Sequence, residues 1–281
     1  MTAVIQPKQL GVCSWSLQPA DSEALVSALD RLEIDVVQLA LVPLVEESGL
    51  WGNAIEQLRD SGVRIASGML EAVGEDYSTL ETIRRTGGVL PEENWPRTHE
   101  RARQVAALAG DAGIDLVTLH AGFVPHDAED PQRATVLERL RILGDLFGGF
   151  GVRVGLETGQ ENAATLWSAL EELDHENVGV NFDPANMILY GMGDPVEAIR
   201  SLGPKVVQVH AKDALPTEEP GTWGSEVPLG SGAVDWDAFL AEVSNLAVVP
   251  DIMIEREAGD ARETDIAQAR DRLLGRTLAR D

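Results

Sequence analysis

The chain has 281 residues and carries 47 acidic against 22 basic side chains, which gives it a formal net charge of −25. Binding to nucleic acid depends on clustered Lys and Arg that neutralise phosphates, so this charge excludes nucleic acid as an expected partner. No apolar stretch approaches the ~20 residues of a membrane span, and the first residues lack the apolar core of a signal peptide, so we expect a cytoplasmic protein that does not bind membranes.

The length fits one (β/α)8 TIM barrel, a fold of roughly 250 residues, and we expect one α/β domain over residues 1–281. Short apolar runs alternate with longer amphipathic stretches, which is the pattern of βαβ units and a parallel sheet. The only cysteine, Cys13, falls in the first run and is interpreted as a small buried hydrophobe. The expected strands are residues 10–14, 34–41, 64–70, 114–120, 152–157, 178–182, 206–210 and 251–255.

The segments between these strands carry the signals of helix ends. Asp130 and Asp194 each precede a proline, so each offers an N-cap acceptor before a residue suited to the first helical position. A long helix is expected near residues 93–112, with Gly113 as its C-cap. Its apolar side chains should face the sheet, while Arg101 should face water.

Two connections are longer than the others, residues 71–92 after the third strand and residues 211–234 after the seventh. Both should lie at the C-terminal mouth of the barrel. The second is rich in Gly and Pro, so it is expected to be irregular, and long loops in compact domains are usually lids or binding loops.

Four of the apolar runs end in an ionisable residue, namely Glu157, Asp183, His210 and Glu255. A charge at the end of a buried strand costs free energy unless it is paired or used. In a (β/α)8 barrel the C-terminal strand ends converge on one mouth, where the active sites of this fold lie. The pattern therefore predicts that the four side chains surround one cavity.

Three carboxylates and one imidazole form a hard, oxygen-rich ligand set. It suits Mn²⁺, our first choice, as well as Mg²⁺ or Co²⁺, and it also permits Zn²⁺. One ion is expected, with coordination positions left for two oxygens of a substrate such as an α-hydroxyketone. The ion would polarise the carbonyl and stabilise the enediolate that forms when the neighbouring C–H loses its proton.

Glu157 and Glu255 bracket the set, so they can approach a bound substrate from different sides. One carboxylate can remove a proton and the other return one, which inverts a stereocentre; return to the adjacent carbon moves the carbonyl instead. Each residue also has a structural interpretation. Asp183 could be a helix cap, His210 a core histidine, and Glu255 half of a rim ion pair with Arg256. Their shared position at successive strand ends favours function.

Several segments resemble the xylose-isomerase-like barrel superfamily of sugar isomerases and epimerases, which includes relatives of tagatose 3-epimerase, hydroxypyruvate isomerase and inosose dehydratase. The likeness is strong from the fourth strand onward and weak before it. The segments are LVTLHAGF (116–123), VGLETGQE (154–161), VGVNFDPANMILYG (178–191), VQVHAKDA (207–214), PLGSGAVDW (228–236) and IEREAG (254–259).

The resemblance implies a TIM barrel in which Glu157, Asp183, His210 and Glu255 hold a divalent ion and the two glutamates act as acid and base. The chain departs from relatives at two positions. Ketose 3-epimerases carry His where this chain has Asn186, and many relatives carry Glu where it has Gln38. Substrate contacts should therefore differ, and the negative charge favours a neutral keto-sugar over a phosphorylated one.

His120, Asn186, Lys212 and Arg256 are the candidate substrate contacts. His120 could equally be a buried structural histidine, and Lys212 could point to a carboxylate instead of the mouth. Trp15 and Trp223 are candidates for stacking on a sugar face, with packing the favoured role for Trp15. The partner is thus a small sugar, and a homo-oligomer stays open.

The main rival function is a dehydratase or lyase acting on a keto-inositol or a 3-ketoglycoside, because the same enediolate can expel a leaving group. An apurinic endonuclease is less favoured, since its trinuclear site needs more histidines than His120 and His210. A non-catalytic sugar-binding barrel would not need the pair of carboxylates, and it should purify without a stoichiometric ion.

Overall fold

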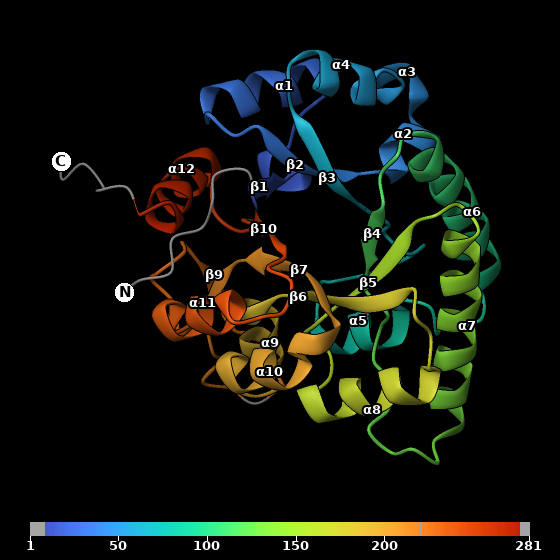
Figure 1. The fold of residues 1–281 in the computed structure, drawn as a ribbon. Helices are drawn as coiled ribbons and strands as arrows, with labels where there is room; N and C mark the ends of the chain where they lie inside the picture. The colour runs from blue at the N-terminus through green and yellow to red at the C-terminus, as the bar shows by residue number, and fades with distance from the viewer. Residues whose placement is uncertain (1–8, 220, 276–281) are drawn as a thin grey trace.

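The computed structural model describes residues 9–219 and 221–275 and folds them around a closed parallel barrel with the strand order β1-β10-β7-β6-β5-β4-β3-β2 (Figure 1). The predicted (β/α)8 barrel and its eight strands are confirmed. The barrel strands are β1 (Leu10–Cys13), β2 (Val36–Ala40), β3 (Arg64–Met69), β4 (Leu116–Leu119), β5 (Arg153–Glu157), β6 (Val178–Phe182), β7 (Val206–Ala211) and β10 (Asp251–Ile254).

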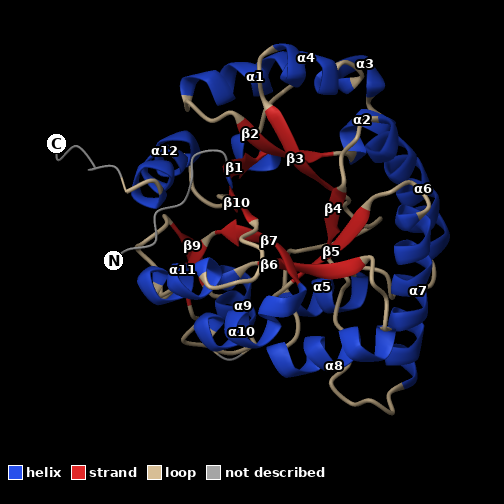
Figure 2. Cartoon of the chain, in the orientation of Figure 1, coloured by secondary structure: helices blue, strands red, loops and turns tan. Residues whose placement is uncertain are grey.

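Helices form an outer ring around the strands (Figure 2). The α-helices are α1 (Ser22–Arg31), α2 (Val42–Glu46), α3 (Ser48–Trp51), α4 (Ala54–Asp60), α5 (Leu80–Thr86), α6 (Trp95–Asp111), α7 (Pro131–Gly148), α8 (Ala163–Leu173), α9 (Pro184–Tyr190), α10 (Pro195–Leu202), α11 (Trp236–Ser244) and α12 (Arg262–Leu273). The 3-10 turns η2 (Ser14–Leu17) and η3 (Gly203–Lys205) lie between these elements. Across residues 9–219 and 221–275, none of the helices has the length and apolar character that a membrane span requires.

The predicted caps of two helices are confirmed. The Asp130 carboxylate accepts from the Gln132 amide at 2.8 Å at the start of α7, and the Asp194 carboxylate accepts from the Val196 amide at 2.8 Å at the start of α10. Each carboxylate satisfies an amide that the first helical turn leaves without a partner.

Helix α6 buries one face against the barrel through small and β-branched residues, including Val105 and Ala109, and Gly113 follows it with φ +63°. The left-handed conformation at Gly113 is the expected C-terminal stop. The expectation that Arg101 faces water is wrong. Its guanidinium lies 2.8 Å from the Glu46 carboxylate and donates to the Glu71 carbonyl at 2.9 Å, because α6 packs beside α2 at the mouth.

The connection after β3 packs tightly against the end of β4. The Val89 amide donates to the Ala121 carbonyl at 3.0 Å, and Gly88 has φ +68°. A Cβ on Gly88 would lie 2.1 Å from the backbone of Ala121, so only glycine fits this approach. The contact fixes the loop that brings Glu75 and Tyr77 to the mouth, as predicted for this connection.

The connection after β7 also reaches the mouth, but the expectation that it is irregular is wrong. It contains an antiparallel pair, β8 (Asp213–Leu215) and β9 (Ser225–Val227). The Asp213 carboxylate accepts from the Gly230 amide at 2.7 Å, the Gly232 amide at 3.1 Å and the Trp236 indole at 3.0 Å. A single buried carboxylate therefore orders this Gly-rich segment by satisfying its amides.

The barrel register is irregular at two places that carry buried polar side chains. Pairing shifts between Val37 and Gln38 in β2, and between Val180 and Asn181 in β6. Such irregularities re-aim a side chain and are common beside active sites. Both Gln38 and Asn181 are fully buried polar residues in strands of the barrel.

Candidate active site

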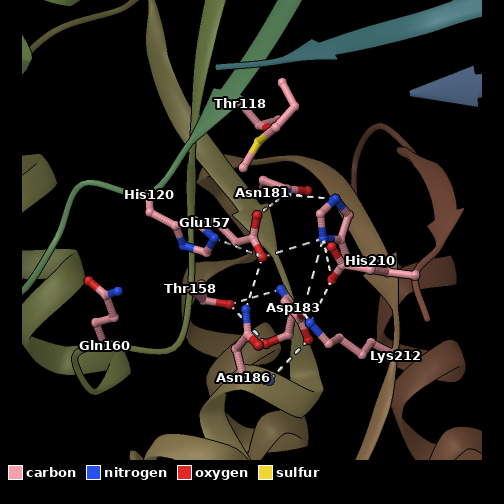
Figure 3. A network of polar contacts seen from close by, with 12 residues as sticks. Thr118, His120, Glu157, Thr158, Gln160, Asn181, Asp183, Asn186, His210 and Lys212 are labelled. Carbon is pink, nitrogen blue, oxygen red and sulfur yellow. Dashed lines mark hydrogen bonds and ion pairs between the residues drawn. The ribbon is translucent and has the colours of Figure 1, made fainter. Parts of the chain in front are cut away.

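The four predicted strand-end residues meet in one cluster. Glu157 ends β5, Asp183 follows β6, His210 lies in β7 and Glu255 follows β10. All four are at most 5% exposed, and one ligand atom from each lies within 4.8 Å of the others. In Figure 3 the side chains of Glu157, Asp183 and His210 point toward a common centre, while Gln160 lies apart.

The cluster fits a divalent ion. Ligand bonds of ~2.0–2.6 Å allow ligand atoms to lie up to roughly 4–5 Å apart, which accommodates the separation of 4.8 Å. Asp183 Oδ2 and His210 Nδ1 are buried without a hydrogen-bond partner among residues 9–219 and 221–275. Leaving a buried polar atom unsatisfied costs about 1–3 kcal/mol, so two such atoms in one cluster indicate a ligand that both would contact.

Asp183 combines the two interpretations that its sequence position allowed. Its Oδ1 accepts from the amides of Ala185 at 2.7 Å and Asn186 at 3.1 Å, which caps α9. The same arrangement leaves Oδ2 directed at the cluster, 3.9 Å from His210 Nδ1. The cap therefore orients the carboxylate, so the structural and functional interpretations are compatible.

His210 is oriented from behind by β2. Its Nε2 lies 2.7 Å from Gln38 Oε1, which can only accept a hydrogen bond, and 3.0 Å from Asn181 Nδ2, which can only donate one; a proton on Nε2 satisfies the shorter contact. Nδ1 faces Glu157 at 3.5 Å and Glu255 at 3.3 Å, a position that suits either a proton or a metal ion. Histidines that bind metals are commonly fixed in this way by a hydrogen bond to the opposite ring nitrogen.

Gln38 belongs to a layer of neutral polar side chains below the four charged residues. Gln38 Oε1 accepts from Gln208 Nε2 at 2.9 Å, and Gln208 Oε1 accepts from Ser67 Oγ at 2.5 Å. Gln38 Nε2 donates to Thr118 Oγ1 at 2.8 Å, and Gln208 Nε2 also reaches Asn181 Oδ1 at 3.2 Å. All five are 0% exposed, so the hydrogen bonds replace the water that these groups have lost.

The two glutamates are held by different partners. Glu157 Oε1 accepts from Asn186 Nδ2 at 2.9 Å, and Glu255 Oε1 accepts from the Trp15 indole at 2.7 Å. Lys212 Nζ donates to Glu255 Oε2 at 3.0 Å. Asn181 Nδ2 also donates to Glu157 Oε2 at 3.3 Å, so neutral amides hold both oxygens of Glu157, whereas Lys212 adds a positive charge beside Glu255.

Burial and charge act against each other in the pKa values of this cluster. Burial raises the pKa of Glu255, but Lys212 and His210 outweigh it and hold that pKa well below its usual range. The pKa of Glu157 is lowered in the same way by His120 and His210. Burial and the two glutamate charges raise the pKa of Asp183 well above its usual range.

His210 shows the opposite balance. Burial lowers its pKa, but the surrounding Glu157 and Glu255 carboxylates raise it well above its ordinary value. A proton and a divalent ion would therefore compete for Nδ1.

Three of the four candidate substrate contacts line the mouth. His120, Asn186 and Lys212 border its cavity, and His120 Nε2 lies 3.7 Å from Glu157 Oε1. Arg256 does not border this cavity. Its guanidinium contacts the Glu226 carboxylate at 2.7 Å and that of Asp265 at 2.9 Å, an arrangement that favours a structural role.

Two residues complete the site through contacts that the sequence did not reveal. Trp15, expected to serve packing, donates to Glu255 and borders the cavity. Glu257 lies 2.5 Å from Lys212 Nζ, so this ammonium bridges two glutamates. Its position two residues after Glu255 is the signal that could have found it, because the side chains of an extended segment alternate in direction.

A family model described as xylose isomerase-like TIM barrel matches residues 26–275, almost the whole described barrel. The chain belongs to this family. An uncharacterized Escherichia coli protein, YihM, is 35% identical over 79 residues, a stretch that covers 28% of this chain and 24% of YihM. That likeness is therefore local.

Two solved structures illustrate the range of likeness. A xylose isomerase domain protein from Planctomyces limnophilus is 30% identical, with a TM-score of 0.84 and 95% of each chain covered. A D-allulose 3-epimerase from Methylomonas sp., in complex with D-allulose, is 15% identical, with a TM-score of 0.70, 98% of this chain and 99% of that chain covered. The second likeness shows a shared fold.

Proposed function

We propose that this protein is a divalent-metal-dependent isomerase or epimerase of a ketose or keto-sugar, with Glu157, Asp183, His210 and Glu255 as the metal ligands. The observation that carries the proposal is the pair of buried, unpartnered atoms, Asp183 Oδ2 and His210 Nδ1, inside a cluster of metal-ligand dimensions. The oxygen-rich set favours Mn²⁺, with Mg²⁺, Co²⁺ or Zn²⁺ as alternatives. A bound ion would polarise the carbonyl of the substrate and stabilise enediolate charge.

Glu157 and Glu255 are assigned the proton transfers. The pKa of each is held below its usual range, so each is ionised at neutral pH and can accept a proton from carbon. The protonated carboxyl can return that proton to the adjacent carbon while the hydroxyl proton passes to the former carbonyl oxygen, which together move the carbonyl. Epimerisation requires the other carboxyl to deliver a proton to the opposite face of the same carbon.

The neighbouring side chains are assigned to orientation. Asn186 holds Glu157 by a hydrogen bond and borders the cavity, and His120 lies on the same side. Lys212 keeps Glu255 ionised and offers its ammonium to a substrate hydroxyl. The likeness to a D-allulose 3-epimerase supports a sugar substrate for this arrangement.

The test is deuterium exchange. The protein is stripped with a chelator, reloaded with Mn²⁺ and incubated in D₂O with free ketoses, keto-inositols and 3-ketoglycosides, and proton NMR follows the C–H beside the carbonyl. We expect exchange that depends on the ion, together with a new epimer or a shifted carbonyl. An Asp183→Asn variant should bind Mn²⁺ weakly in calorimetry, because an amide lacks the ligand charge.

The other outcomes are distinct. An unsaturated product would replace the isomerase by a dehydratase or lyase at the same site. Stoichiometric metal without exchange on any of the three substrate classes would contradict the proposed reaction. Purified protein that binds no divalent ion in calorimetry would contradict the metal site and favour a sugar-binding barrel.

A further inference from the structure

The mouth cavity is larger than a single sugar ring needs. Its volume is about 1010 Å³, whereas pockets of ~300–1,000 Å³ enclose drug-sized ligands. Glu255, Asn186, Lys212 and His120 border its inner end, where the proposed chemistry takes place. A single ketose held against these residues would leave the outer part of the cavity unfilled.

The outer part has two walls on opposite sides of the barrel. One wall follows β2 and includes Val42 and Pro43; the other follows β6 and includes Leu189 and Tyr190. Strands β2 and β6 are four positions apart in the eight-stranded ring, so the walls face each other across the mouth. Both walls border the same cavity as Glu255, so a substituent on the reacting sugar can contact them.

The wall after β6 carries an aromatic surface. Trp223 packs edge-on against Tyr190 with a centroid separation of 4.9 Å, and Tyr190 packs against Phe123 at 5.8 Å. Trp223 and Tyr190 both border the cavity and are partly exposed. Aromatic rings fixed in this way bind the apolar C–H faces of a pyranose while their edges remain wet.

The charge of the cavity excludes an anionic substituent. The two cations on its described lining, Lys212 and Arg101, are both paired with carboxylates, Arg101 with Glu46 at 2.8 Å. Further carboxylates complete the lining, among them Glu47 and Glu71. A phosphate or carboxylate on the substrate would meet these negative charges, with neither lining cation free to neutralise it.

We propose that the substrate is an uncharged glycoside, a keto-sugar that carries a second sugar ring or similar neutral group. This inference rests on the proposed function and names its substrate class. The keto ring lies at the inner end against the four clustered residues. The second ring lies between Trp223 and the β2 wall, where Val42 and Pro43 offer apolar contact and the neighbouring Glu46 and Glu47 carboxylates disfavour an anion.

The test uses a matched pair of probes, 3-ketoglucose and the disaccharide 3-ketotrehalose, with 3-ketoglucose 6-phosphate as the anionic comparison. Calorimetry on the Mn²⁺-loaded protein measures affinity, and deuterium exchange is recorded separately. We expect the disaccharide to bind about tenfold or more tightly than the monosaccharide, and the phosphate ester to bind most weakly. Trp223→Ala should bring the disaccharide to monosaccharide ratio close to one.

The exclusion of anionic substrates is tested by changing a charge at the rim of the cavity. Glu47→Lys should improve binding of the phosphate ester relative to 3-ketoglucose, because it adds a cation at the cavity lining. Glu176→Lys makes the same charge change before β6, at the other end of the barrel, and should leave this ratio unchanged. A larger gain for Glu176→Lys would contradict the local charge argument.

The inference is overturned if the two sugars bind equally, if neither binds, or if the phosphate ester binds best. Its failure is distinguishable from failure of the proposed function. Tight, Trp223-dependent binding of the disaccharide without any exchange would retain the glycoside site and reject the isomerase chemistry. Deuterium exchange with equal affinity for both sugars would retain the isomerase chemistry and reject the glycoside site.

Discussion

The barrel interior holds two polar layers that differ in charge. The upper layer, at the mouth, consists of Glu157, Asp183, His210 and Glu255, which come from β5, β6, β7 and β10. The lower layer is neutral, with Gln38, Ser67 and Thr118 contributed by β2, β3 and β4, and Asn181 and Gln208 contributed by β6 and β7. His210 joins them, because its two ring nitrogens face different layers.

The two layers differ in how the hydrogen bonds of their polar atoms are satisfied. The polar atoms of the lower layer find partners within the layer and on Glu157 and His210 above it, whereas the upper layer leaves Asp183 Oδ2 and His210 Nδ1 without hydrogen-bond partners among the described residues. A closed network stabilises a fixed arrangement, and an incomplete one indicates a binding site. The lower layer therefore positions the upper one, and substitutions in the two layers should have different effects.

The largest effect is expected from the upper layer. Glu157→Gln and Glu255→Gln should each leave the barrel folded and lower turnover by roughly 10²–10⁴-fold or more, because an amide keeps the shape but cannot accept a proton. Metal affinity should fall as well. Rates of deuterium exchange and of product formation on the substrate found in the screen measure turnover, calorimetry with Mn²⁺ measures metal affinity, and circular dichroism checks folding.

Glu176→Gln is the matched control, since this exposed residue precedes β6 at the other end of the barrel. If one glutamate variant still exchanges the proton but forms no product, the two carboxylates act on different faces. Full activity in both variants would remove their acid–base roles.

The second-largest effect concerns stability and is expected from Glu161. Positive neighbours lower the pKa values of Glu157 and Glu255, whereas burial alone acts on Glu161. Glu161 is 4% exposed, and burial raises its pKa from 4.5 to about 8. The unfolded chain thus ionises at lower pH than the folded one, so stability should fall as pH rises from about 4.5 to about 8. The loss at pH 8 is on the order of a few kcal/mol.

Glu161→Gln should remove this slope, because an amide stays neutral at every pH. The variant should match the wild type near pH 4 and exceed it in stability at pH 8, as measured by urea unfolding at both values. Identical pH profiles for the two proteins would show that Glu161 is solvated or paired. Glu171→Gln, at an exposed position of α8, controls for the loss of one charge.

The contrast between the layers also explains what the sequence could predict. Each residue of the upper layer ends an apolar run, so a lone ionisable group marks it, and its strand places it at the mouth. Gln38 and Gln208 lie inside their strands and are neutral, so nothing in the pattern separates them from ordinary buried amides. Partners such as Trp15 and Glu255 lie 240 residues apart, and only closure of the barrel brings them together.

Two loop expectations failed for related reasons. The segment after β7 looked irregular because Gly and Pro dominate it, yet the Asp213 carboxylate orders it through amides that the sequence does not mark. Arg101 looked solvent-facing from helical periodicity alone, but α2 supplies a carboxylate beside it. Both errors come from tertiary contacts between segments whose local patterns are uninformative.

The third prediction tests whether the lower layer positions the upper one. Gln38→Leu removes the acceptor that fixes His210 Nε2, so the Nδ1 lone pair is no longer held toward the cluster. Loss of such a contact typically weakens metal binding by ~10–100-fold. Calorimetric titration with Mn²⁺ gives the affinity, and circular dichroism confirms that the barrel is folded.

Gln38→Glu is the informative companion, because a carboxylate also accepts from Nε2. It should retain affinity within a few-fold of the wild type. If the leucine variant binds Mn²⁺ as tightly as the glutamate variant, the hydrogen bond from β2 does not orient the ligand, and the two layers are independent.

The smallest effect on metal affinity is expected one hydrogen bond farther from the metal cluster. Ser67→Ala removes the hydroxyl that donates to Gln208 Oε1 at 2.5 Å, and Gln208 contacts Gln38 through its other amide atom. A buried acceptor left without its donor costs about 1–3 kcal/mol, so the free energy of unfolding should fall by that amount. Gln38 keeps its contact with His210, so Mn²⁺ affinity should change by less than about threefold. An effect carried by separate hydrogen bonds should weaken with each bond away from His210. A larger loss of Mn²⁺ affinity for Ser67→Ala than for Gln38→Leu would therefore contradict this order and mean that the lower layer transmits strain as a rigid unit.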